Sequence, residues 1–437
     1  MNRWPVFRLV PFDHARVLAP WCLVRTGESP VFRVRRIAHQ LEEAGTPRPA
    51  AWERGFAHAV FLAVSARQIL LTWKPEFRGV KRHYGIGALR QLRDLVRLAW
   101  RGNLPPRVYY FQRLFKRDRI GQLSVIEHRE IQFLLRVLHT RVDLSVLDDK
   151  IAFQKFAAQH GLPTPPILAI YAQGGLLGAA PADAAWRTDL FVKPARSYAS
   201  IGVSAWKYDA TTERYTDGKL TLDLAQLQSW LAQQSRATTQ VVQPRIGNAP
   251  DLLPITGSAL ANCRIITARR LDGSIFVLLA VLRIGLGKAI SSDDTVVTFC
   301  AAVDRDTGAL SAGETKTAAQ GSFPQHPETG APIAGRVLPR WAEMRDLALR
   351  AHAAMPDMVF VGWDAVDTER GPMLLEGNYV WGGNLAQMAG NLPLGATEFS
   401  ELFLQHYERL GHGAVEGAAL AEELAATAAP FGGRPNG

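Results

Sequence analysis

Two stretches near the C-terminus bring oxygen-bearing side chains together. Residues 362–366 and 372–378 have the apolar composition of strands and are separated by a short turn segment ending in glycine, so they predict a β-hairpin. Asp364 would project from the first strand, and Glu376 and Asn378, two residues apart, would project from one face of the second. Two carboxylates and an amide oxygen on adjacent strands suit Mg²⁺ bound together with nucleotide phosphates. An ordinary hairpin with one exposed acidic face is the alternative.

A lysine at the end of a predicted strand is the second candidate. Residues 190–194 form an apolar run that carries Lys193, residues 195–202 follow as a loop of mostly small residues, and another β-rich run begins after Gly202. Backbone N–H groups of such a loop can close over phosphate groups while Lys193 supplies a positive charge. A plain hairpin with a surface lysine is the alternative.

The third candidate is Lys150, at the start of a predicted helix over residues 150–156. Asp148 or Asp149 can cap this helix, and a glycine and a proline after it end the helix near Gly161. A lysine in a first turn is unfavourably placed for the helix dipole, which indicates another role. A solvated side chain without a special role is the alternative.

Composition predicts a soluble globular protein with more than one packed unit. The chain has 437 residues, 47% of them apolar and 21% charged, and this length favours two or three units. Cys22, Cys263 and Cys300 form no CxxC pair, which argues against a disulfide framework and for a reducing compartment. The N-terminal residues show no uninterrupted apolar signal region, and the most hydrophobic window, residues 56–73, is too polar to span a bilayer comfortably. We therefore expect a cytoplasmic protein.

Positive charge is concentrated in the first third of the chain. Residues 1–140 hold 25 Arg and Lys against 10 Asp and Glu, a net charge of +15, while the remainder has a net charge of −5. The basic part could dock an acidic partner such as anionic lipid, an acidic glycan or a sugar nucleotide. A solvated, arginine-rich helical surface is the alternative. Nucleic acid is not expected, because none of the usual binding motifs is present.

Helical periodicity dominates the same first third. Apolar residues recur at helical spacing across residues 30–140, with a break in the Asn-Leu-Pro-Pro segment at residues 103–106. Further helices are expected at residues 224–233, 340–355 and 397–409. After about residue 140 short β-rich runs alternate with loops, which predicts an α+β architecture. The expected strands cover residues 166–171, 190–192, 203–208, 239–243, 264–268, 274–282, 296–303, 358–366 and 372–375.

The order of these segments resembles the ATP-grasp superfamily, to which D-alanine–D-alanine ligase and glutathione synthetase belong. The similarity covers about residues 145–400, from the helix at Lys150 through the loop after Lys193 to Asp364 and the Glu-x-Asn of the last hairpin. Within the superfamily, the chain looks most like the sugar-transfer associated ATP-grasp group, related to α-L-glutamate ligases. The segments that carry this likeness are Gln243-Pro244-Arg245-Ile246, Arg264-Ile265-Ile266-Thr267 and Gly362-Trp363-Asp364 with Leu375-Glu376-Gly377-Asn378.

This resemblance implies an ATP-grasp fold, in which two α+β subdomains clasp ATP. A basic, mainly helical N-terminal region would occupy residues 1–140. Residues 141–243 would form the lid subdomain and residues 244–412 the catalytic core. Residues 413–437, rich in Ala, Gly and Pro, would form a flexible C-terminal tail.

Position by position, the resemblance implies a nucleotide site beside a magnesium site. Lys150 and Lys193 would contact the nucleotide phosphates, and Asp364, Glu376 and Asn378 would bind Mg²⁺. The other nucleotide contacts would come from the phosphate loop, the adenine-binding hinge and a candidate for the ribose hydroxyls: Ser197, Ser200 and Gly202, then Gln243, Arg245 and Ile246, then Asp251.

Arginines near the transferred phosphate are the expected catalytic residues. Related ligases often carry one two residues before the magnesium aspartate, but Gly362 occupies that position here. The resemblance therefore assigns the role to Arg264, with Arg283 as a second candidate, and a structural role at the surface is the alternative for both. The phosphate loop also departs from the family's pattern, because Tyr198 stands where a glycine is common.

The implied activity is that of a carboxylate–amine ligase that uses ATP and Mg²⁺ and proceeds through an acyl phosphate. Its substrates would be a small-molecule or sugar-linked carboxylate and an amine, such as an amino acid joined to a sugar acid in surface-polysaccharide or cell-envelope biosynthesis. One alternative is an ATP-grasp phosphotransferase acting on a hydroxyl. Another is a non-catalytic binding or scaffolding protein of a glycan-synthesis assembly, docked to a membrane or a glycosyltransferase through its basic N-terminal region.

Overall fold

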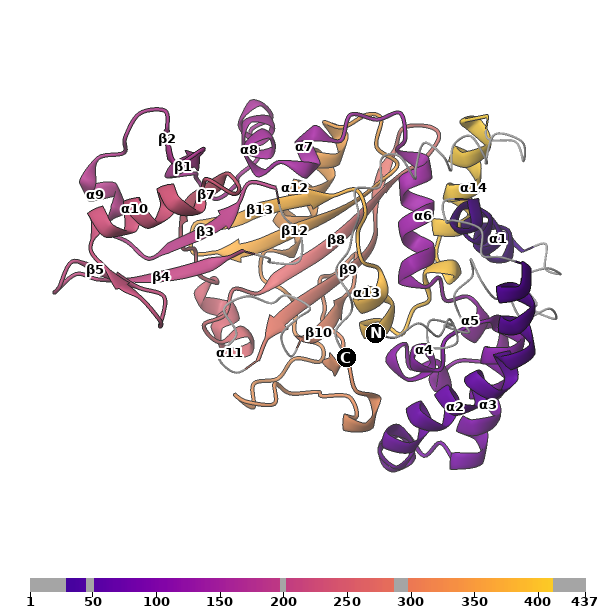
Figure 1. Cartoon of the computed structure of the whole chain (residues 1–437). Coiled ribbons are helices and arrows are strands. Elements are labelled where there is room, and N and C mark those ends of the chain that lie inside the picture. Colours follow the sequence, from indigo (N-terminus) through magenta and orange to yellow (C-terminus); the bar gives the residue numbers. More distant parts are fainter. Residues whose placement is uncertain (1–28, 45–50, 197–201, 287–297, 412–437) are drawn as a thin grey trace.

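The chain folds into two antiparallel sheets flanked at one end by a helical region. The computed structural model describes residues 29–44, 51–196, 202–286 and 298–411. In Figure 1 the sheet that contains β1–β7 lies on the left, the sheet of β8–β13 occupies the centre, and α1–α6 lie on the right. This is an α+β architecture preceded by a mainly helical N-terminal region, as the sequence predicts.

Local sequence explains where the N-terminal helices start and stop. α3 buries Leu95, Leu98 and Ala99 at helical spacing, and it ends because Asn103 adopts the left-handed conformation, with φ 47°, before a Pro-Pro pair. α6 begins with a capping box in which the Glu127 side chain takes part. No helix in the described ranges is both long and apolar enough to cross a membrane. The elements are α1 (Pro30–Ala44), α2 (Ala51–Tyr84), α3 (Ala88–Gly102), α4 (Pro106–Phe111), η3 (Leu114–Lys116), α5 (Arg119–Leu123) and α6 (His128–Leu138).

The first sheet has seven strands in the order β2-β1-β7-β3-β4-β5-β6. Trp186, Leu190, Trp206 and Leu231 are buried where α9 and α10 cover this sheet. Its strands are β1 (Ala169–Ala172), β2 (Gly175–Leu177), β3 (Leu190–Pro194), β4 (Ser204–Asp209), β5 (Arg214–Thr216), β6 (Thr221–Leu222) and β7 (Gln240–Pro244). The helices of this part are α7 (Ser145–Asp148), α8 (Lys150–Gln159), α9 (Asp183–Trp186) and α10 (Leu224–Gln234).

The second sheet has six strands in the order β11-β10-β9-β8-β12-β13. The chain enters it directly after β7, because Asn248 already pairs with Thr368 at the end of β12. Its strands are β8 (Asn262–Arg269), β9 (Ile275–Gly285), β10 (Thr298–Val303), β11 (Glu314–Thr315), β12 (Phe360–Thr368) and β13 (Gly371–Asn378). The accompanying helices are η4 (Pro250–Leu252), α11 (Leu253–Thr256), η5 (Ala318–Gln320), α12 (Trp341–Ala353), α13 (Asn384–Ala389), η6 (Leu394–Ala396) and α14 (Phe399–Arg409).

Helices cover both faces of the second sheet, which explains why β8 and β12 are buried along almost their whole length. Alternate residues such as Ile265 and Val361 pack with α12 and α8 on one face. The intervening residues, such as Ile266 and Phe360, pack with α1, α6, α13 and α14 on the other. The N-terminal helices α1 and α6 therefore belong to the same core as the C-terminal helix α14.

A second contact ties the helical region to the sheet through α2 and η5. Gly79 of α2 approaches the backbone of Ala319 so closely that a Cβ atom on it would lie 2.4 Å from the Ala319 oxygen. Glu76 accepts a hydrogen bond of 2.8 Å from the Ala319 N–H. Arg113, which is fully buried, pairs at 3.1 Å with Glu314 of β11. The helical region is thus packed against the sheet at two places, not attached through a linker alone.

Candidate functional site

A row of charged side chains crosses one face of the second sheet. Asp364 of β12 lies directly opposite Arg264 of β8 on one side and opposite Glu376 of β13 on the other. Directly opposed residues of antiparallel strands project to the same side of the sheet, so the three side chains share a face. Asn378, two residues after Glu376 on β13 and opposite Gly362, lies on the same face.

A β-bulge in β13 decides which face Glu376 occupies. The register shifts between Asp364 and Ala365, which pair with Glu376 and Leu374, so Leu375 has no partner of its own in the ladder. Leu374 is therefore fully buried in the core with Ala365, although it stands only two residues before Glu376. In a regular strand these two side chains would share a face, and the bulge places the carboxylate on the face of Asp364.

Two arginines hold Asp364 ionised. Arg264 Nε and Arg283 Nη2 both donate to Asp364 Oδ1, the latter at 3.0 Å. Both guanidinium side chains are nearly buried, with 10% and 11% of their surface exposed, so neither is a surface arginine. Burial of Asp364 disfavours its charged form, but the two arginines more than compensate and lower its pKa to about 2.

Asn262 belongs to the same face and was missed in the sequence. It stands two residues before Arg264 on β8, pairs with Arg283 of β9, and its side chain helps to lower the pKa of Asp364. Its Oδ1 and the Nε of Arg283 are buried, and within the described residues neither has a hydrogen-bond partner. Buried polar atoms are normally paired, so these two atoms are suited to contact a bound ligand. The alternation of Asn262 and Arg264 on a strand was the signal that could have found it.

Two lysines reach the same row from other elements. Lys150 Nζ, at the first position of α8, lies 3.8 Å from Glu376 Oε2. Lys193 projects from β3 of the other sheet. Loss of hydration lowers the pKa of Lys193 to about 8, the charge of Lys150 acts in the same direction, and Glu376 and Asp364 oppose the shift. The structure therefore brings together Lys150, Lys193, Asp364 and Glu376 from four separate elements.

Local contacts position the start of α8 beside β3. Of the two caps that the sequence allows, Asp148 and Asp149, Asp149 is the helix N-cap and accepts hydrogen bonds from the backbone N–H groups of Ile151 and Ala152. The Lys150 N–H donates to the Ala195 carbonyl at 3.0 Å, just past the end of β3. Arg196 pairs with Asp149 at 3.0 Å. These contacts hold the backbones of Lys150 and of the Lys193 strand side by side.

The three predicted oxygen ligands fit Mg²⁺ by chemistry. Asp364 and Glu376 supply carboxylates, and the Asn378 amide nitrogen donates to the Gly362 carbonyl at 3.4 Å, which leaves its oxygen as the acceptor end. Carboxylate and amide oxygens are the hard ligands that Mg²⁺ prefers, with the remaining positions filled by water or phosphate oxygen. No group of three or more His, Cys, Asp or Glu able to hold a metal occurs in the part of the chain that the structure describes.

The model of one protein family covers all of these residues. The family described as sugar-transfer associated ATP-grasp matches residues 129–397, which include both lysines, both arginines and the three predicted oxygen ligands. The chain belongs to the sugar-transfer associated ATP-grasp family. No curated protein matches the chain.

Solved structures with a similar arrangement are distant from this family member. The VanG D-Ala:D-Ser ligase from Enterococcus faecalis is 13% identical, with a TM-score of 0.36, and the match covers 60% of this chain and 62% of that one. D-alanyl-alanine synthetase A from Vibrio cholerae is 13% identical, with a TM-score of 0.35 and coverage of 60% and 65%. An L-amino acid ligase from Bacillus licheniformis is 12% identical, with a TM-score of 0.32 and coverage of 57% and 48%. The chain thus spans less than two thirds of the length of each of these proteins.

The absence of an arginine at position 362 of this ATP-grasp protein has a steric reason. A Cβ atom on Gly362 would lie 2.5 Å from Cβ of Trp381, which is fully buried beside the strand. The same Cβ would lie 3.3 Å from the side chain of Arg264. Trp381 and Arg264 therefore fill the space that a side chain at this position would need, and the guanidinium groups near Asp364 come from β8 and β9 instead.

The predicted phosphate loop is described only at its ends. Gly202 has φ +77°, and a Cβ atom on it would lie 3.0 Å from the ring of Pro194, so this position requires glycine both for conformation and for space. Ser197, Ser200 and Tyr198 lie outside the described residues.

The predicted adenine and ribose contacts lie on the connection between the sheets. The Gln243 side chain, which is buried, donates to the Pro165 carbonyl at 2.9 Å and so joins β7 to the segment before β1. Arg245 is exposed, and Ile246 is half-buried. Asp251 is exposed in η4, and its charge acts on Asp367, about 10 Å along β12 from Asp364.

Proposed function

We propose that this protein is an ATP- and Mg²⁺-dependent carboxylate–amine ligase that acts through an acyl phosphate. The observation that carries the proposal is the meeting of Lys150 and Lys193 with Asp364 and Glu376. Cations from the side of the first sheet face acidic ligands on the second, which is the charge pattern that a metal-bound triphosphate requires. In this proposal residues 141–243 act as the lid, residues 244–412 as the core, and residues 1–140 as a separate helical region.

Each group of residues has a role in the proposal. Lys150 and Lys193 neutralise the nucleotide phosphates, and the loop from Ala195 to Gly202, with Ser197 and Ser200, closes over them. The hinge residues Gln243, Arg245 and Ile246 border the adenine, and Asp251 is the candidate for the ribose. Asp364, Glu376 and Asn378 hold Mg²⁺, which when bound would offset the charge of the phosphate oxygens.

In the proposal Arg264 and Arg283 act on the group being transferred. Both already donate to Asp364, and the buried Nε of Arg283 retains donor capacity within the described residues. A substrate carboxylate oxygen would attack the γ-phosphorus of ATP, and the bond from phosphorus to the bridging oxygen would break to release ADP. The amine would then attack the acyl carbon, lose a proton, and displace phosphate through a tetrahedral species. The side chains would contribute positioning and charge neutralisation to both steps, because no nucleophile from the protein is required.

The substrates in this proposal are an amino acid and a sugar acid or sugar-linked carboxylate. The support is the family's association with sugar transfer. The product would be an amide on a precursor of a surface polysaccharide or another cell-envelope component, made in the cytoplasm, where ATP is available.

An ADP-release screen over amino acids and sugar acids, with hydroxylamine in parallel reactions, tests the proposal. Hydroxylamine traps an acyl phosphate as a hydroxamate, whereas a phosphorylated hydroxyl gives none. Glu376→Ala should abolish Mg²⁺-dependent ADP release and leave the protein folded. Glu369→Ala, an exposed glutamate in the turn of the same hairpin, is the matched control and should retain activity.

Two results would overturn the ligase proposal. A stable phosphorylated product without hydroxamate would assign phosphotransfer to a hydroxyl. No ADP release with any pair of substrates would favour the non-catalytic interpretation.

A further inference from the structure

The outer face of α2 is exposed and takes no part in the site described above. Trp52, Phe56 and Leu70 on this helix have 61%, 37% and 55% of their surface exposed. Trp52 and Phe56 are four residues apart, and Leu70 stands 18 residues, or five full turns, after Trp52, so the three share one side of the helix. Five of the twelve large apolar side chains exposed in the described chain lie on α2: Trp52, Phe56, Leu62, Leu70 and Leu71.

These exposed side chains are not the edge of a core. The side of α2 that faces α3 and α4 is apolar too, and its Phe61, Ile69 and Val80 are buried in the cluster that includes those helices. The helix therefore packs fully through one face and carries a second apolar stripe on the other. Single exposed apolar residues are ordinary on a protein surface, but a stripe along one helix marks an interaction site.

The same outer face carries positive charge. Arg67, Lys74 and Lys81 are exposed and recur at intervals of seven residues, which keeps them on the side of Leu70. Between residues 55 and 84 the sole acidic residue in the sequence is Glu76, which is half-buried and accepts a hydrogen bond from the Ala319 N–H. We define the α2 outer face as the exposed residues Trp52, Phe56, Ala59, Ala63, Arg67, Leu70, Lys74 and Lys81.

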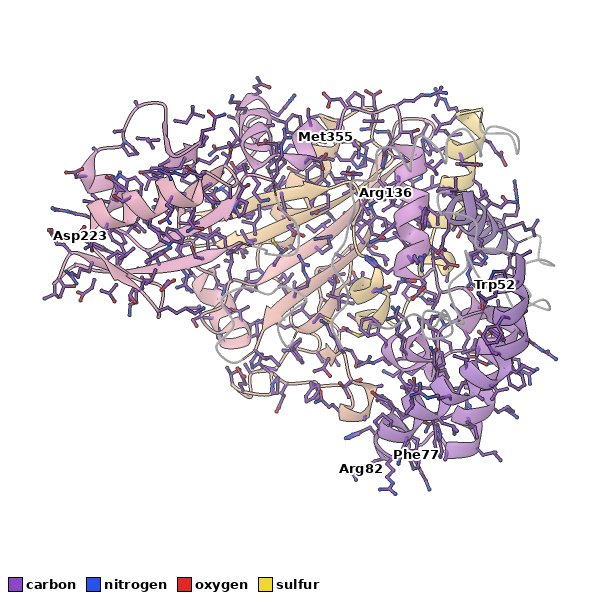
Figure 2. All side chains as sticks on the ribbon, in the orientation of Figure 1. Trp52, Phe77, Arg82, Arg136, Asp223 and Met355 are labelled. Carbon is purple, nitrogen blue, oxygen red and sulfur yellow. The ribbon has the colours of Figure 1, made fainter. Side chains whose placement is uncertain are left out.

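The α2 outer face extends along the helical region, away from the first sheet. Figure 2 shows Trp52 on the right side of the molecule, at about mid-height, and Arg82, which is also exposed, at its lower edge. From Trp52 to Lys81 the helix rises about 44 Å. Residues 51–102, which cover α2 and α3, hold ten basic residues against three acidic ones.

We propose that the α2 outer face docks on an anionic phospholipid surface. The aromatic and leucine side chains would enter the headgroup region, and the lysines and arginine would pair with lipid phosphates. Charge selects this occupant over a second copy of the chain. A symmetric dimer through this face would set its cations against the cations or the apolar stripe of the partner, and neither arrangement supplies counter-charge.

Sedimentation of the full-length protein with vesicles tests the docking. We expect the protein to pellet with vesicles of phosphatidylcholine and phosphatidylglycerol, but not with phosphatidylcholine alone. Each cation near such a surface contributes about fivefold to partitioning, so Lys74→Gln with Lys81→Gln should weaken binding at least about tenfold. Trp52→Ser with Leu70→Ser should weaken it similarly, and salt at about 0.5 M should weaken binding of the unchanged protein.

Matched controls distinguish docking through the α2 outer face from nonspecific effects of net charge or exposed apolar surface. Lys207→Gln with Lys219→Gln removes two exposed lysines from the first sheet, and Leu177→Ser with Leu253→Ser removes two leucines that are 61% and 46% exposed. Both control proteins should bind as the unchanged protein does. The proposal is overturned if the unchanged protein stays in solution with anionic vesicles, or if the controls lose as much binding as the α2 variants. It is also overturned if light scattering shows a dimer that the Trp52 and Leu70 changes dissociate.

Discussion

Lys150 Nζ lies 3.8 Å from Glu376 Oε2 and so joins the first turn of α8 to the edge strand of the second sheet. The same Glu376 raises the pKa of Lys193, which projects from β3, while Lys150 lowers it. One carboxylate therefore serves as counter-charge for two lysines that would otherwise repel each other. Nucleotide phosphates would supply the same counter-charge. The two ammonium groups would therefore pair with Glu376 in the absence of nucleotide and with the phosphates in its presence.

Phosphate binding should depend on the protonation of Lys193. Because its pKa is about 8, the ammonium form prevails below pH 8 and is lost as the pH rises further. We expect the affinity for a non-hydrolysable ATP analogue with Mg²⁺ to fall about tenfold between pH 7 and pH 9, measured by calorimetry. Lys193→Arg keeps the charge across this range and should flatten the dependence. An equal fall in the variant would show that another group titrates.

Gly362→Ala should destabilise the protein although the added group is one methyl. Its Cβ would lie 2.5 Å from Cβ of Trp381, which is fully buried. Overpacking of this kind costs about 1–3 kcal/mol of unfolding free energy, which urea denaturation measures. Gly175→Ala in β2 is the control, because nothing lies within 4 Å of its added Cβ. Equal unfolding midpoints for the two variants would contradict the steric explanation.

Sequence patterns predicted the helices and strands better than the arrangement of side chains between them. Helical and strand periodicity follow from local spacing, so the hairpin with Asp364 and Glu376 could be expected. The bulge at Leu375 could not, because a one-residue register shift leaves no periodic trace, yet it determines the face that Glu376 occupies.

Pairing of side chains across strands could not be predicted either. The contact of Arg283 with Asp364 depends on the order β9-β8-β12 within the sheet, and sequence spacing does not encode that order. Asn262 was missed for a simpler reason: the expected strand began at Arg264, two residues after it, although β8 begins at Asn262. The exposure of Trp52 and Leu70 could not be predicted either. Both faces of α2 are apolar, so the sequence does not show which face is buried.

Two glycines of α2 should respond to alanine in opposite directions. Gly79→Ala would place a Cβ 2.4 Å from the Ala319 backbone oxygen, whereas nothing lies within 4 Å of a Cβ on Gly55. Gly55→Ala should therefore raise the unfolding free energy by about 0.5–1 kcal/mol through helix propensity. Gly79→Ala should lower it by about 1–3 kcal/mol, because α2 must move away from η5. Thermal unfolding of both proteins checks the pair, and stabilisation by both changes would show that the contact can relax freely.

Buried neutral histidines should make the fold sensitive to mild acid. Burial lowers the pKa of His139 to about 3 and that of His352 to about 4, well below the ordinary value of 6.5. The unfolded chain then binds protons first, so stability is full above pH 6.5 and falls as the pH drops toward those folded values. As the pH drops from 7.5 to 5.5, each of these histidines should lower the unfolding free energy by about 1 kcal/mol. Urea titrations measure this fall, to which carboxylates add only at lower pH. Burial also lowers the pKa values of His326 and His406, which add to this dependence, so His139→Gln should remove less than half of it. His83→Gln, an exposed control, should leave it unchanged. A stability that is flat over this interval would mean that the histidines take up protons without unfolding.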